Sequence, residues 1–597
     1  MSRSDVLSAF EQRLQSDADL MAFTFASHPD SAKDSDRVSY RQLDSRARRT
    51  AAWLEERTRP GDRVLLLHAP GVEFAASFFA CLRAGVIAVP CSLPGRFRHE
   101  RARLVGIARD SGAAAVLTDR RSRPDVEKWA ADAGVAAVIS PPTETLRGEP
   151  ERDRPRVPVT PDTVAFLQYT SGSTGAPKGV MVTHGNVTVN TMSVRRAFGS
   201  TPGTRYGGWI PLHHDMGLIG LMLTGVLRGR GYVQMDPMAF LRRPHLWLRM
   251  LEAFDVNGTA APDFGYELCL RRVTDEQLTG LDLSHVTQLA NGSEPVRAST
   301  MERFCERFAP YGVRRRAMQP TYGLAEATLV VSGTAERAER TVAMDAVALE
   351  RGALRRRASG APARVLASCG RPVDCRVRIV DPGTHERLPA GRVGEIWLSG
   401  PGVTAGYWHA PEATRAVFHA RTSEGDGPYL RTGDLGGVLD GDLFVTGRRK
   451  DVLVIHGRSL HPQDIEDELR VQHEELHGLR GAVLLVGGDD DTGLDPTLVV
   501  VHEIRGHWGE RHRSDTATAM KHTIAREFGA PVGAVALVRP GGVRRTTSGK
   551  TQRAAMRALY LAGALDTLTL SEDPRLGEAL RFLRARPGRP DHARESA

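Results

Sequence analysis

The chain has 597 residues, of which 41% are apolar and 25% are charged, and its formal net charge at pH 7 is +9. This length exceeds one ordinary hydrophobic core, so we expect two or more domains of a soluble globular protein. No apolar run reaches the ~18–20 residues that cross a bilayer. The segment 1–11 carries acidic residues and no apolar core, which excludes a secretory signal.

Two further features of the composition narrow the class of protein. The six cysteines are scattered without metal-binding spacing, which favours reduced thiols in the cytoplasm. The arginines are spread along the chain and do not gather with aromatic residues in one basic block. Nucleic-acid binding is therefore a weak hypothesis, and the mild positive charge suits an acidic partner equally well.

Short apolar strands alternate with helices through the first half of the chain. The pattern begins with a strand at 64–68, a helix at 72–83 and a strand at 86–89. Further strands are predicted at 113–117, 135–139, 164–169, 179–183, 231–235, 257–261 and 286–290. This alternation indicates parallel α/β layers.

The second half of the chain changes character. Short strands separated by Gly-rich turns predict a β-rich subdomain at about 370–447 within an N-terminal domain, 1–447. After a hinge-like segment, 448–451, a block with strands at 452–455, 482–486 and 497–501 and a helix opening near Pro462 predicts a small α+β domain, 452–570. The Arg- and Pro-rich tail, 571–597, is expected to be loosely ordered.

The most informative motif lies at 169–179 and is Tyr-Thr-Ser-Gly-Ser-Thr-Gly-Ala-Pro-Lys-Gly. Glycine tolerates positive φ, so such a loop can turn its backbone N–H groups inward while hydroxyls and an ammonium complete a cradle for a polyphosphate. It is not a Walker A loop, because glycine and a strand follow Lys178. The alternative is a flexible Ser/Gly turn. The candidate ligand-binding residues are Thr170, Ser171, Gly172, Ser173, Thr174, Gly175 and Lys178.

Lysine is rare in this chain. Only six of the 80 basic residues are lysines, and three of them, Lys178, Lys450 and Lys550, lie in Gly-rich or hinge-like motifs. A compact ammonium can follow one phosphate oxygen through a reaction, which a planar guanidinium cannot do. Chance placement is the alternative.

Five further polar clusters lie at 209–218, 291–295, 319–326, 429–434 and 545–550. Adjacent His213 and His214 point in different directions without a third ligand, so a buried histidine or the wall of a substrate cavity is favoured over a metal site. Tyr322 and Glu326 share one face if the segment is helical. Asp434 could hold a diol such as ribose. Each cluster alone is also explained as a structural turn, but their combination and order favour a function.

Taken together, these motifs resemble those of the adenylate-forming (ANL) superfamily, which includes acyl-CoA synthetases, luciferases and the adenylation domains of peptide synthetases. The resemblance runs from about residue 20 to about 565. Within the superfamily the chain is most similar to the fatty acyl-AMP ligases, on the passages 211–220, 291–297, 322–329 and 461–466. An insertion at about 332–368 also matches these ligases. The resemblance implies an α/β N-terminal domain with a β-rich subdomain, hinged to a small α+β C-terminal domain.

The resemblance implies a role for each candidate residue. The loop from Thr170 to Lys178 would grip the β- and γ-phosphates of ATP, and Glu326 would bind Mg²⁺. Lys550 would reach the fatty carboxylate and the α-phosphate, which makes Lys550, Glu326 and Thr170 the candidate catalytic residues. Lys450 would occupy the hinge. The adenine and α-phosphate pocket would be lined by Asn291, Gly292, Ser293, Glu294, Tyr322 and Gly323.

Two other pairs complete the implied site. Asp434, assisted by Arg448, would accept hydrogen bonds from the ribose hydroxyls. His214 and Asp215 would flank the acyl tunnel. The chain departs from the ligase pattern at His213, where the ligases usually show Tyr, and at 459–462, where Ser-Leu-His-Pro replaces Asn-His-Tyr-Pro.

The implied reaction has two steps: a fatty acid and ATP give acyl-AMP and pyrophosphate, and the phosphopantetheine thiol of a carrier then takes the acyl group. We expect a separate acyl carrier protein, or a carrier domain of a polyketide or peptide synthase, in lipid, polyketide or lipopeptide biosynthesis. The nearest alternative is an acyl-CoA or aryl-CoA synthetase. A catalytically silent nucleotide- or acyl-binding partner is the alternative from another class.

Overall fold

A computed structural model of the chain describes residues 5–33, 35–95, 98–147, 157–171, 177–335, 340–449, 453–455, 458–460, 462–487, 496–545 and 551–585. The chain divides into two compact units. The first comprises Met1–Asp345, Leu354–Thr432 and Gly436–Val445, and the second comprises Ala346–Ala353, Gly433–Leu435 and Thr446–Ala597. Over the described ranges, the structure contains no helix with the length and apolarity to cross a membrane.

A six-stranded sheet with the strand order β6-β5-β3-β4-β7-β8 forms one part of the first unit. Its strands are β3 (Arg63–Leu67), β4 (Ile87–Pro90), β5 (Ala115–Thr118), β6 (Val138–Ile139), β7 (Val164–Ser171) and β8 (Pro177–Thr183). Neighbouring strands run parallel except β7 and β8, which are antiparallel. The predicted parallel α/β layering is thus confirmed.

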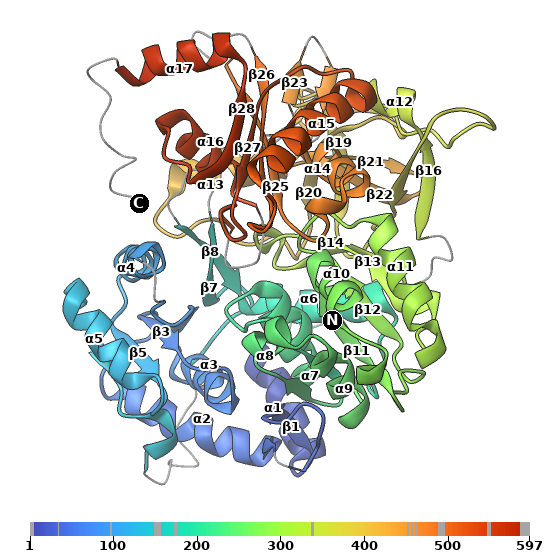
Figure 1. The fold of residues 1–597 in the computed structure, drawn as a ribbon. Helices are drawn as coiled ribbons and strands as arrows, with labels where there is room; N and C mark the ends of the chain where they lie inside the picture. Colours follow the sequence, from blue (N-terminus) through green and yellow to red (C-terminus); the bar gives the residue numbers. More distant parts are fainter. Residues whose placement is uncertain are drawn as a thin grey trace. The chain divides into compact units, whose positions relative to one another are not determined.

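Helices cover both faces of this sheet. Along β3, Val64 and Leu66 belong to the same buried cluster as Phe78 of α3 (Val72–Ala84), whereas Leu65 and Leu67 pack in a second cluster. That second cluster includes residues of α4 (Arg98–Ser111) and α5 (Arg123–Ala133). Figure 1 shows α3 on one side of β3 and β5 and the helices α4 and α5 on the other. Alternate residues of a strand face opposite sides, so a strand buried on both faces is apolar throughout.

A seven-stranded sheet, with the order β13-β12-β11-β9-β10-β1-β2, forms the other large layer of this unit. Its strands are β1 (Met21–Phe25), β2 (Asp36–Ser39), β9 (Tyr206–Gly208), β10 (Tyr232–Gln234), β11 (Gly258–Ala261), β12 (Gln288–Asn291) and β13 (Met318–Pro320). Ala261 pairs with Asn291, and Asn291 pairs with Pro320, in parallel register. The three strands therefore end at the same edge.

The remaining helices of this unit connect and cover its strands. They are α1 (Val6–Asp17), α2 (Tyr40–Glu55), α6 (His184–Phe198), α7 (Thr224–Arg228), α8 (Pro237–Arg242), α9 (His245–Ala253), α10 (Asp263–Arg272), α11 (Ala298–Phe308) and α13 (Pro411–Phe418). Capping boxes begin α2 at Ser39 and α6 at Thr183, where each side chain accepts a hydrogen bond from the backbone three residues on.

Small antiparallel sheets follow along the chain, as expected for a β-rich region. One joins β14 (Tyr322–Gly323), β15 (Val330–Gly333) and β18 (Arg371–Pro372). A second pairs β16 (Thr341–Asp345) with β17 (Ala363–Ala367), and α12 (Ala346–Glu350) lies between them in sequence. A four-stranded sheet contains β19 (Arg376–Val380), β20 (Gly394–Ser399), β21 (Leu430–Leu439) and β22 (Asp442–Arg448).

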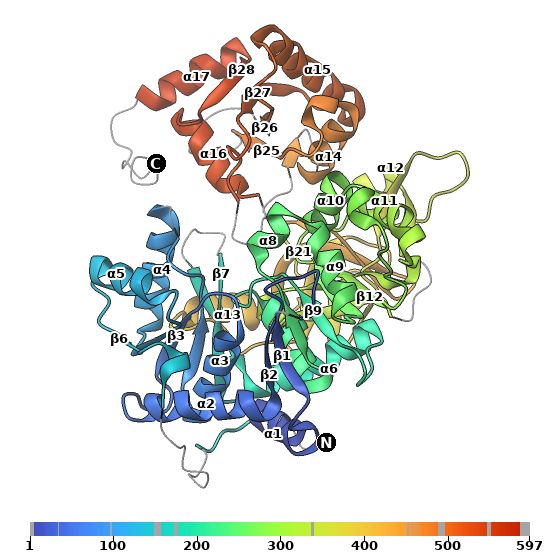
Figure 2. The same ribbon diagram turned by 60° about the horizontal axis from the view of Figure 1, so that its bottom comes forward.

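The second unit contains its own sheet, β25-β26-β27-β28, with helices on both faces, as Figure 2 shows. Helices α14 and α15 share one buried cluster with the strands, and α16 and α17 share another. Its elements are β23 (Leu453–Ile455), β24 (Arg458–Leu460), α14 (Pro462–Gln472), β25 (Gly481–Val486), β26 (Thr497–Glu503), α15 (Glu510–Phe528), β27 (Val532–Val538), α16 (Arg553–Ala562), β28 (Thr567–Glu572) and α17 (Pro574–Ala585).

The end of the chain is more ordered than the sequence predicts. Instead of loose chain after residue 570, β28 continues to Glu572 and the helix α17 follows. Leu576 and Leu580, one helical turn apart, are buried against the sheet. The high arginine content concealed this apolar spacing in the sequence.

Candidate functional site

The strands β7 and β8 form a hairpin that presents the base of the predicted phosphate loop. Thr170 lies opposite Lys178, and Ser171 lies opposite Pro177. Directly opposed residues of an antiparallel pair project from the same face of the sheet, so Thr170 and Lys178 lie side by side. The predicted loop residues Gly172, Ser173, Thr174 and Gly175 lie outside the described residues.

Tyr322 and Glu326 do not share a helix, so the condition under which they would share one face is not met. Tyr322 lies in β14, and Glu326 lies in a separate 3-10 turn, Ala325–Ala327. A Cβ atom placed on Gly323 would lie 1.8 Å from the carbonyl oxygen of Leu329. The chain thus reverses between β14 and the antiparallel β15, with Glu326 in the connecting segment, and the spacing of side chains in the sequence does not reveal this reversal.

Glu326 and Lys178 both contact Tyr407. The Tyr407 hydroxyl donates a hydrogen bond to Oε1 of Glu326 at 2.8 Å, and Nζ of Lys178 lies over the Tyr407 ring, 5.1 Å from its centroid. Glu326 is half-buried. The structure thus brings together two residues that lie 148 positions apart in the sequence and that were predicted separately as a phosphate ligand and a metal ligand.

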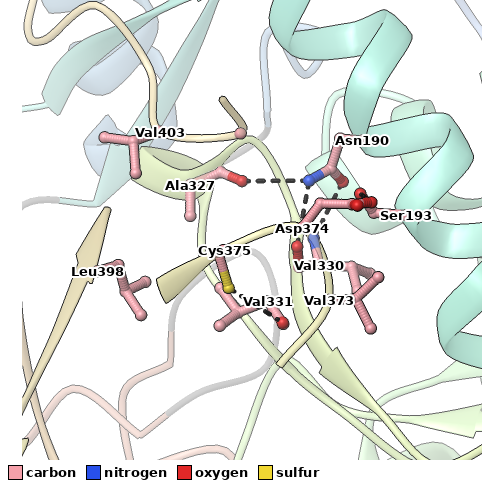
Figure 3. A pocket seen from close by; sticks show the side chains of 11 residues that line it. Asn190, Ser193, Ala327, Val330, Val331, Val373, Asp374, Cys375, Leu398 and Val403 are labelled. Carbon is pink, nitrogen blue, oxygen red and sulfur yellow. Dashed lines mark hydrogen bonds between the residues drawn. The ribbon is translucent and has the colours of Figure 1, made fainter. Parts of the chain in front are cut away.

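A small cavity lies behind the turn that carries Glu326 (Figure 3). The Asn190 side-chain amide donates to the carbonyl oxygens of Ala327 at 3.3 Å and Val330 at 3.1 Å, and its oxygen accepts from the Val330 N–H at 3.1 Å. Ser193 donates to Asp374 at 2.7 Å. These polar groups are engaged within the protein, so they hold the turn in place and we assign the cavity no ligand.

The shared edge of β11, β12 and β13 gathers a second set of predicted residues. Asn291 ends β12, and the Thr321 N–H donates to its carbonyl oxygen at 2.9 Å. A Cβ atom on Gly292 would lie 2.7 Å from Cγ2 of Thr321, so a side chain at this position would require Thr321 to shift. Ser293 adopts φ +71°, a left-handed conformation that few non-glycine residues take. In open α/β sheets, ligands bind outside the carboxyl ends of the strands, as at this edge.

A buried carboxylate fixes this turn. Asp263 is completely buried and accepts hydrogen bonds from Nδ2 of Asn291 at 3.0 Å and from the Arg297 N–H at 3.1 Å. The Arg297 guanidinium lies 3.3 Å from its other oxygen. Burial raises the pKa of Asp263 to about 7, against the lowering effect of the Arg297 charge. Nearby, Oε1 of Glu294 accepts from the Phe264 N–H at 2.7 Å.

Asp434 and Arg448 form an ion pair in the second unit. Nε of Arg448 lies 2.9 Å from Oδ1 of Asp434. The Asp434 side chain is 7% exposed, whereas that of Arg448 is 55% exposed. The two residues that the resemblance implies at the ribose are therefore in contact with each other. The predicted hinge and catalytic lysines, Lys450 and Lys550, lie outside the described residues.

The His213–Asp215 segment is attached to β7. Nε2 of Gln168 donates to the His213 carbonyl oxygen at 2.8 Å. Burial, followed by the charges of His214 and Arg103, lowers the pKa of His213 well below its usual range, so this residue is neutral. Asp215 accepts from the Met216 N–H at 2.7 Å and begins a π-helix, Met216–Leu223. π-helical segments are rare and occur often at functional sites.

The donor set is compatible with Mg²⁺ delivered with a nucleotide. Throughout the ranges that the structure covers, no group of three or more His, Cys, Asp or Glu could hold a metal ion. Mg²⁺ commonly binds through one or two carboxylates together with substrate phosphates and water. A single half-buried carboxylate, Glu326, with one oxygen oriented by a phenol, fits that mode.

Sequence reasoning missed two functional candidates. Tyr407 stands in Ala-Gly-Tyr-Trp, a segment with no catalytic signature, and its contact with Glu326 joins residues far apart in the chain. Asp263 is the first residue of α10 and resembles an ordinary first-turn acid. Only its complete burial distinguishes it, and burial of a single carboxylate leaves no local signal in a sequence.

The family model of AMP-binding enzymes matches residues 10–408. The medium-chain-fatty-acid–[acyl-carrier-protein] ligase of Moorena producens is 37% identical over 89% of this chain and 91% of its own length. The long-chain-fatty-acid–AMP ligase of Mycobacterium tuberculosis is 37% identical over 95% of this chain and 99% of its own.

Solved structures agree with these matches. The fatty acyl-adenylate ligase of L. pneumophila in complex with acyl adenylate and pyrophosphate superposes with a TM-score of 0.72. Its sequence identity to this chain is 31%, over 95% of this chain and 98% of that one. The predicted ANL fold and the resemblance to fatty acyl-AMP ligases are therefore confirmed, and the chain belongs to the family of AMP-binding enzymes.

Proposed function

We propose that this protein activates a fatty acid with ATP and passes the acyl group to the phosphopantetheine thiol of a separate acyl carrier protein. In the first step, a carboxylate oxygen attacks the α-phosphorus, the bond to the β-phosphate breaks, and acyl-AMP and pyrophosphate form. In the second, the thiol sulfur attacks the acyl carbon, AMP leaves, and the thiol proton passes to solvent. The ligases of M. producens and M. tuberculosis support this assignment by their names and their coverage.

One observation supports the first step most directly: Lys178 and Glu326 are both held against Tyr407. Adenylation places a triphosphate beside an attacking carboxylate, so negative charge must be balanced where pyrophosphate leaves. Lys178, with Thr170 beside it, would bind the β- and γ-phosphates. Glu326 would hold Mg²⁺, which when bound neutralises charge on the phosphate oxygens.

Other predicted residues would bind the rest of the nucleotide. Adenine and the α-phosphate would lie against the turn from Asn291 to Glu294 and against Tyr322, at the common edge of β11, β12 and β13. The ribose hydroxyls would donate to Asp434, which Arg448 orients. The acyl chain would pass His214 and Asp215.

A movement of the C-terminal domain would separate the two steps. We propose a hinge at 448–451, with Lys450 at its centre, between the domains 1–447 and 452–570. Lys550 would reach the carboxylate and the α-phosphate for adenylation and would leave when the carrier thiol enters, a common form of gating. The six free thiols suit a reducing compartment, and we place the enzyme in the cytoplasm.

The decisive experiment supplies fatty acids of increasing length with Mg·ATP, then offers CoA or a holo acyl carrier protein, and identifies the products by mass. We expect pyrophosphate release with a fatty acid and acylation of the carrier protein. Acyl-CoA as the main product would instead make the enzyme an acyl-CoA synthetase, and no pyrophosphate release with any acid would refute activation itself.

The Lys550→Ala variant tests the catalytic assignment. We expect it to lose acyl-AMP formation while retaining ATP binding, because Lys550 acts on the attacking carboxylate and the α-phosphate. Pyrophosphate exchange near the wild-type rate would contradict this role.

A further inference from the structure

Tyr407 holds two separate chemical groups with two different parts of its side chain. Its hydroxyl donates to the Glu326 carboxylate at 2.8 Å, and its ring face lies under the Lys178 ammonium at 5.1 Å. A ring face attracts a cation, and a phenol donates a strong hydrogen bond to a carboxylate. Tyr407 is buried, with 8% of its surface exposed.

The backbone around Tyr407 connects the two structural elements that it touches. The Met181 N–H donates to the Gly406 carbonyl oxygen at 2.9 Å, and the Trp408 N–H donates to that of Gly179 at 2.7 Å, which adds this segment to the edge of β8. On the other side, the N–H and the hydroxyl of Thr404 donate to the Glu326 carbonyl oxygen at 3.0 and 3.1 Å. The segment thus fixes the Glu326 turn relative to the Lys178 strand.

The Tyr407 ring itself is held in one orientation. Phe418, from α13, packs edge-on against it with 5.2 Å between centroids. The Thr414 hydroxyl, from the same helix, accepts a hydrogen bond from the Tyr407 N–H at 3.0 Å. Because the ring edge and the backbone of Tyr407 are both held, the ring can fix the positions of the two groups that it contacts, which a freely rotating ring could not do.

We propose that Tyr407 is a positioning residue that sets the distance between the metal-binding carboxylate and the phosphate-binding ammonium. This inference rests on the proposed roles of Glu326 and Lys178 and adds a residue to them. The hydroxyl orients one carboxylate oxygen and leaves the other side of the carboxylate for the metal. The ring places the ammonium of Lys178 beside it, so that both can contact the same triphosphate.

Two substitutions separate the two contacts. Tyr407→Phe removes the hydroxyl and keeps the ring, whereas Tyr407→Leu removes both. Tyr560→Phe is the matched control, because the Tyr560 hydroxyl also donates to a carboxylate, that of Glu572 at 2.5 Å, and neither residue is a predicted site residue. Thermal unfolding of the three variants establishes that each is folded before binding is compared.

The first measurement is ATP binding by calorimetry with Mg²⁺ and with EDTA, without a fatty acid and therefore without turnover. We expect the strengthening of ATP binding by Mg²⁺ to fall about tenfold in Tyr407→Phe, the value of one hydrogen bond to a charged group. Tyr560→Phe should behave as the wild type. An unchanged Mg²⁺ effect in Tyr407→Phe would overturn the proposal.

The second measurement follows Lys178 in the free protein. Mild acetylation with an amine-selective reagent, read by peptide mass spectrometry, compares Lys178 with exposed Lys128 as an internal reference. We expect Tyr407→Leu to raise the relative reactivity of Lys178 roughly threefold, since the ring no longer stabilises the ammonium. Tyr407→Phe should leave it near the wild-type value. Equal reactivity in all three proteins would contradict the contact with the ring.

Glu326→Gln distinguishes a failure of this inference from a failure of the proposed function. If Glu326 holds the metal, Glu326→Gln loses the Mg²⁺ effect, and adding Tyr407→Phe changes it no further. If Glu326→Gln binds Mg·ATP like the wild type, the metal role itself is wrong. If Glu326→Gln loses the effect but Tyr407→Phe keeps it, only the positioning role of Tyr407 is wrong.

Discussion

Replacing Asp263 by Asn should change how the stability of the protein depends on pH. The carboxyl is fully buried, and its pKa is raised to about 7 from an ordinary value of 3.8. Between these values the folded protein binds a proton that the unfolded chain has released. The contribution of Asp263 to the free energy of unfolding is therefore greatest at low pH, and it falls as the pH rises toward and through 7.

The magnitude follows from the two pKa values. A tenfold difference in proton affinity corresponds to about 1.36 kcal/mol, so the ionised group opposes folding by about 4 kcal/mol well above pH 7. About 2–3 kcal/mol of this develops between pH 5 and pH 8. Asn resembles the protonated acid and carries no such dependence. The free energy of unfolding of Asp263→Asn minus that of the wild type should therefore be about 2–3 kcal/mol larger at pH 8 than at pH 5.

Urea unfolding of both proteins at pH 5 and pH 8 measures this difference. Asp255→Asn is the control, because Asp255 is exposed and pairs with Arg230 at 3.4 Å on the surface. The difference in free energy of unfolding between Asp255→Asn and the wild type should be the same at pH 5 and pH 8. If the difference for Asp263→Asn is also the same at both pH values, the Arg297 charge compensates the burial of Asp263 fully, and our reasoning about this carboxylate is refuted.

Three other predictions concern separate parts of the chain. Gly323→Ala should destabilise the protein by about 2 kcal/mol or more and abolish pyrophosphate release, since its Cβ would lie 1.8 Å from the Leu329 oxygen. Gly506→Ala is the control, because no atom lies near its Cβ position. A stable and active Gly323→Ala variant would contradict the close approach of the two backbone segments. Arg448→Ala should weaken ATP binding about tenfold by removing a partner of Asp434, and unchanged affinity by calorimetry would argue against the ribose role. Burial raises the pKa of the Cys91 and Cys369 thiols to about 12, so Ellman's reagent at pH 8 should label them only after denaturation; rapid labelling of the native protein would show that they are accessible.

Much of the fold could be predicted from the sequence because its strands are short, apolar and separated by clear breaks. Each strand predicted between residues 64 and 290 overlaps an observed one. The Asn291 turn could also be predicted, since a polar, Gly-containing run directly follows an apolar strand. These features are local, and local patterns carry most of the information in a single sequence.

The features that could not be predicted depend on contacts between distant segments. Tyr322 and Glu326 have the spacing of a helix face, but the backbone contact between Gly323 and Leu329 overrides it. Tyr407 contacts Glu326 across a sequence separation of 81 residues, which no local pattern reveals. The helix α17 was not predicted, because arginines are interspersed in the sequence around its two buried residues, Leu576 and Leu580.

The common edge of β11, β12 and β13 allows the loops that follow these strands to change separately during evolution. Each strand delivers its own loop to that edge, and the register between the strands is fixed by the sheet. Under the roles proposed above, a substitution in the turn at Asn291 would alter the contacts to adenine while the loop at Glu326 keeps its place. Selectivity for the nucleotide and the handling of its phosphates would then evolve independently on one scaffold.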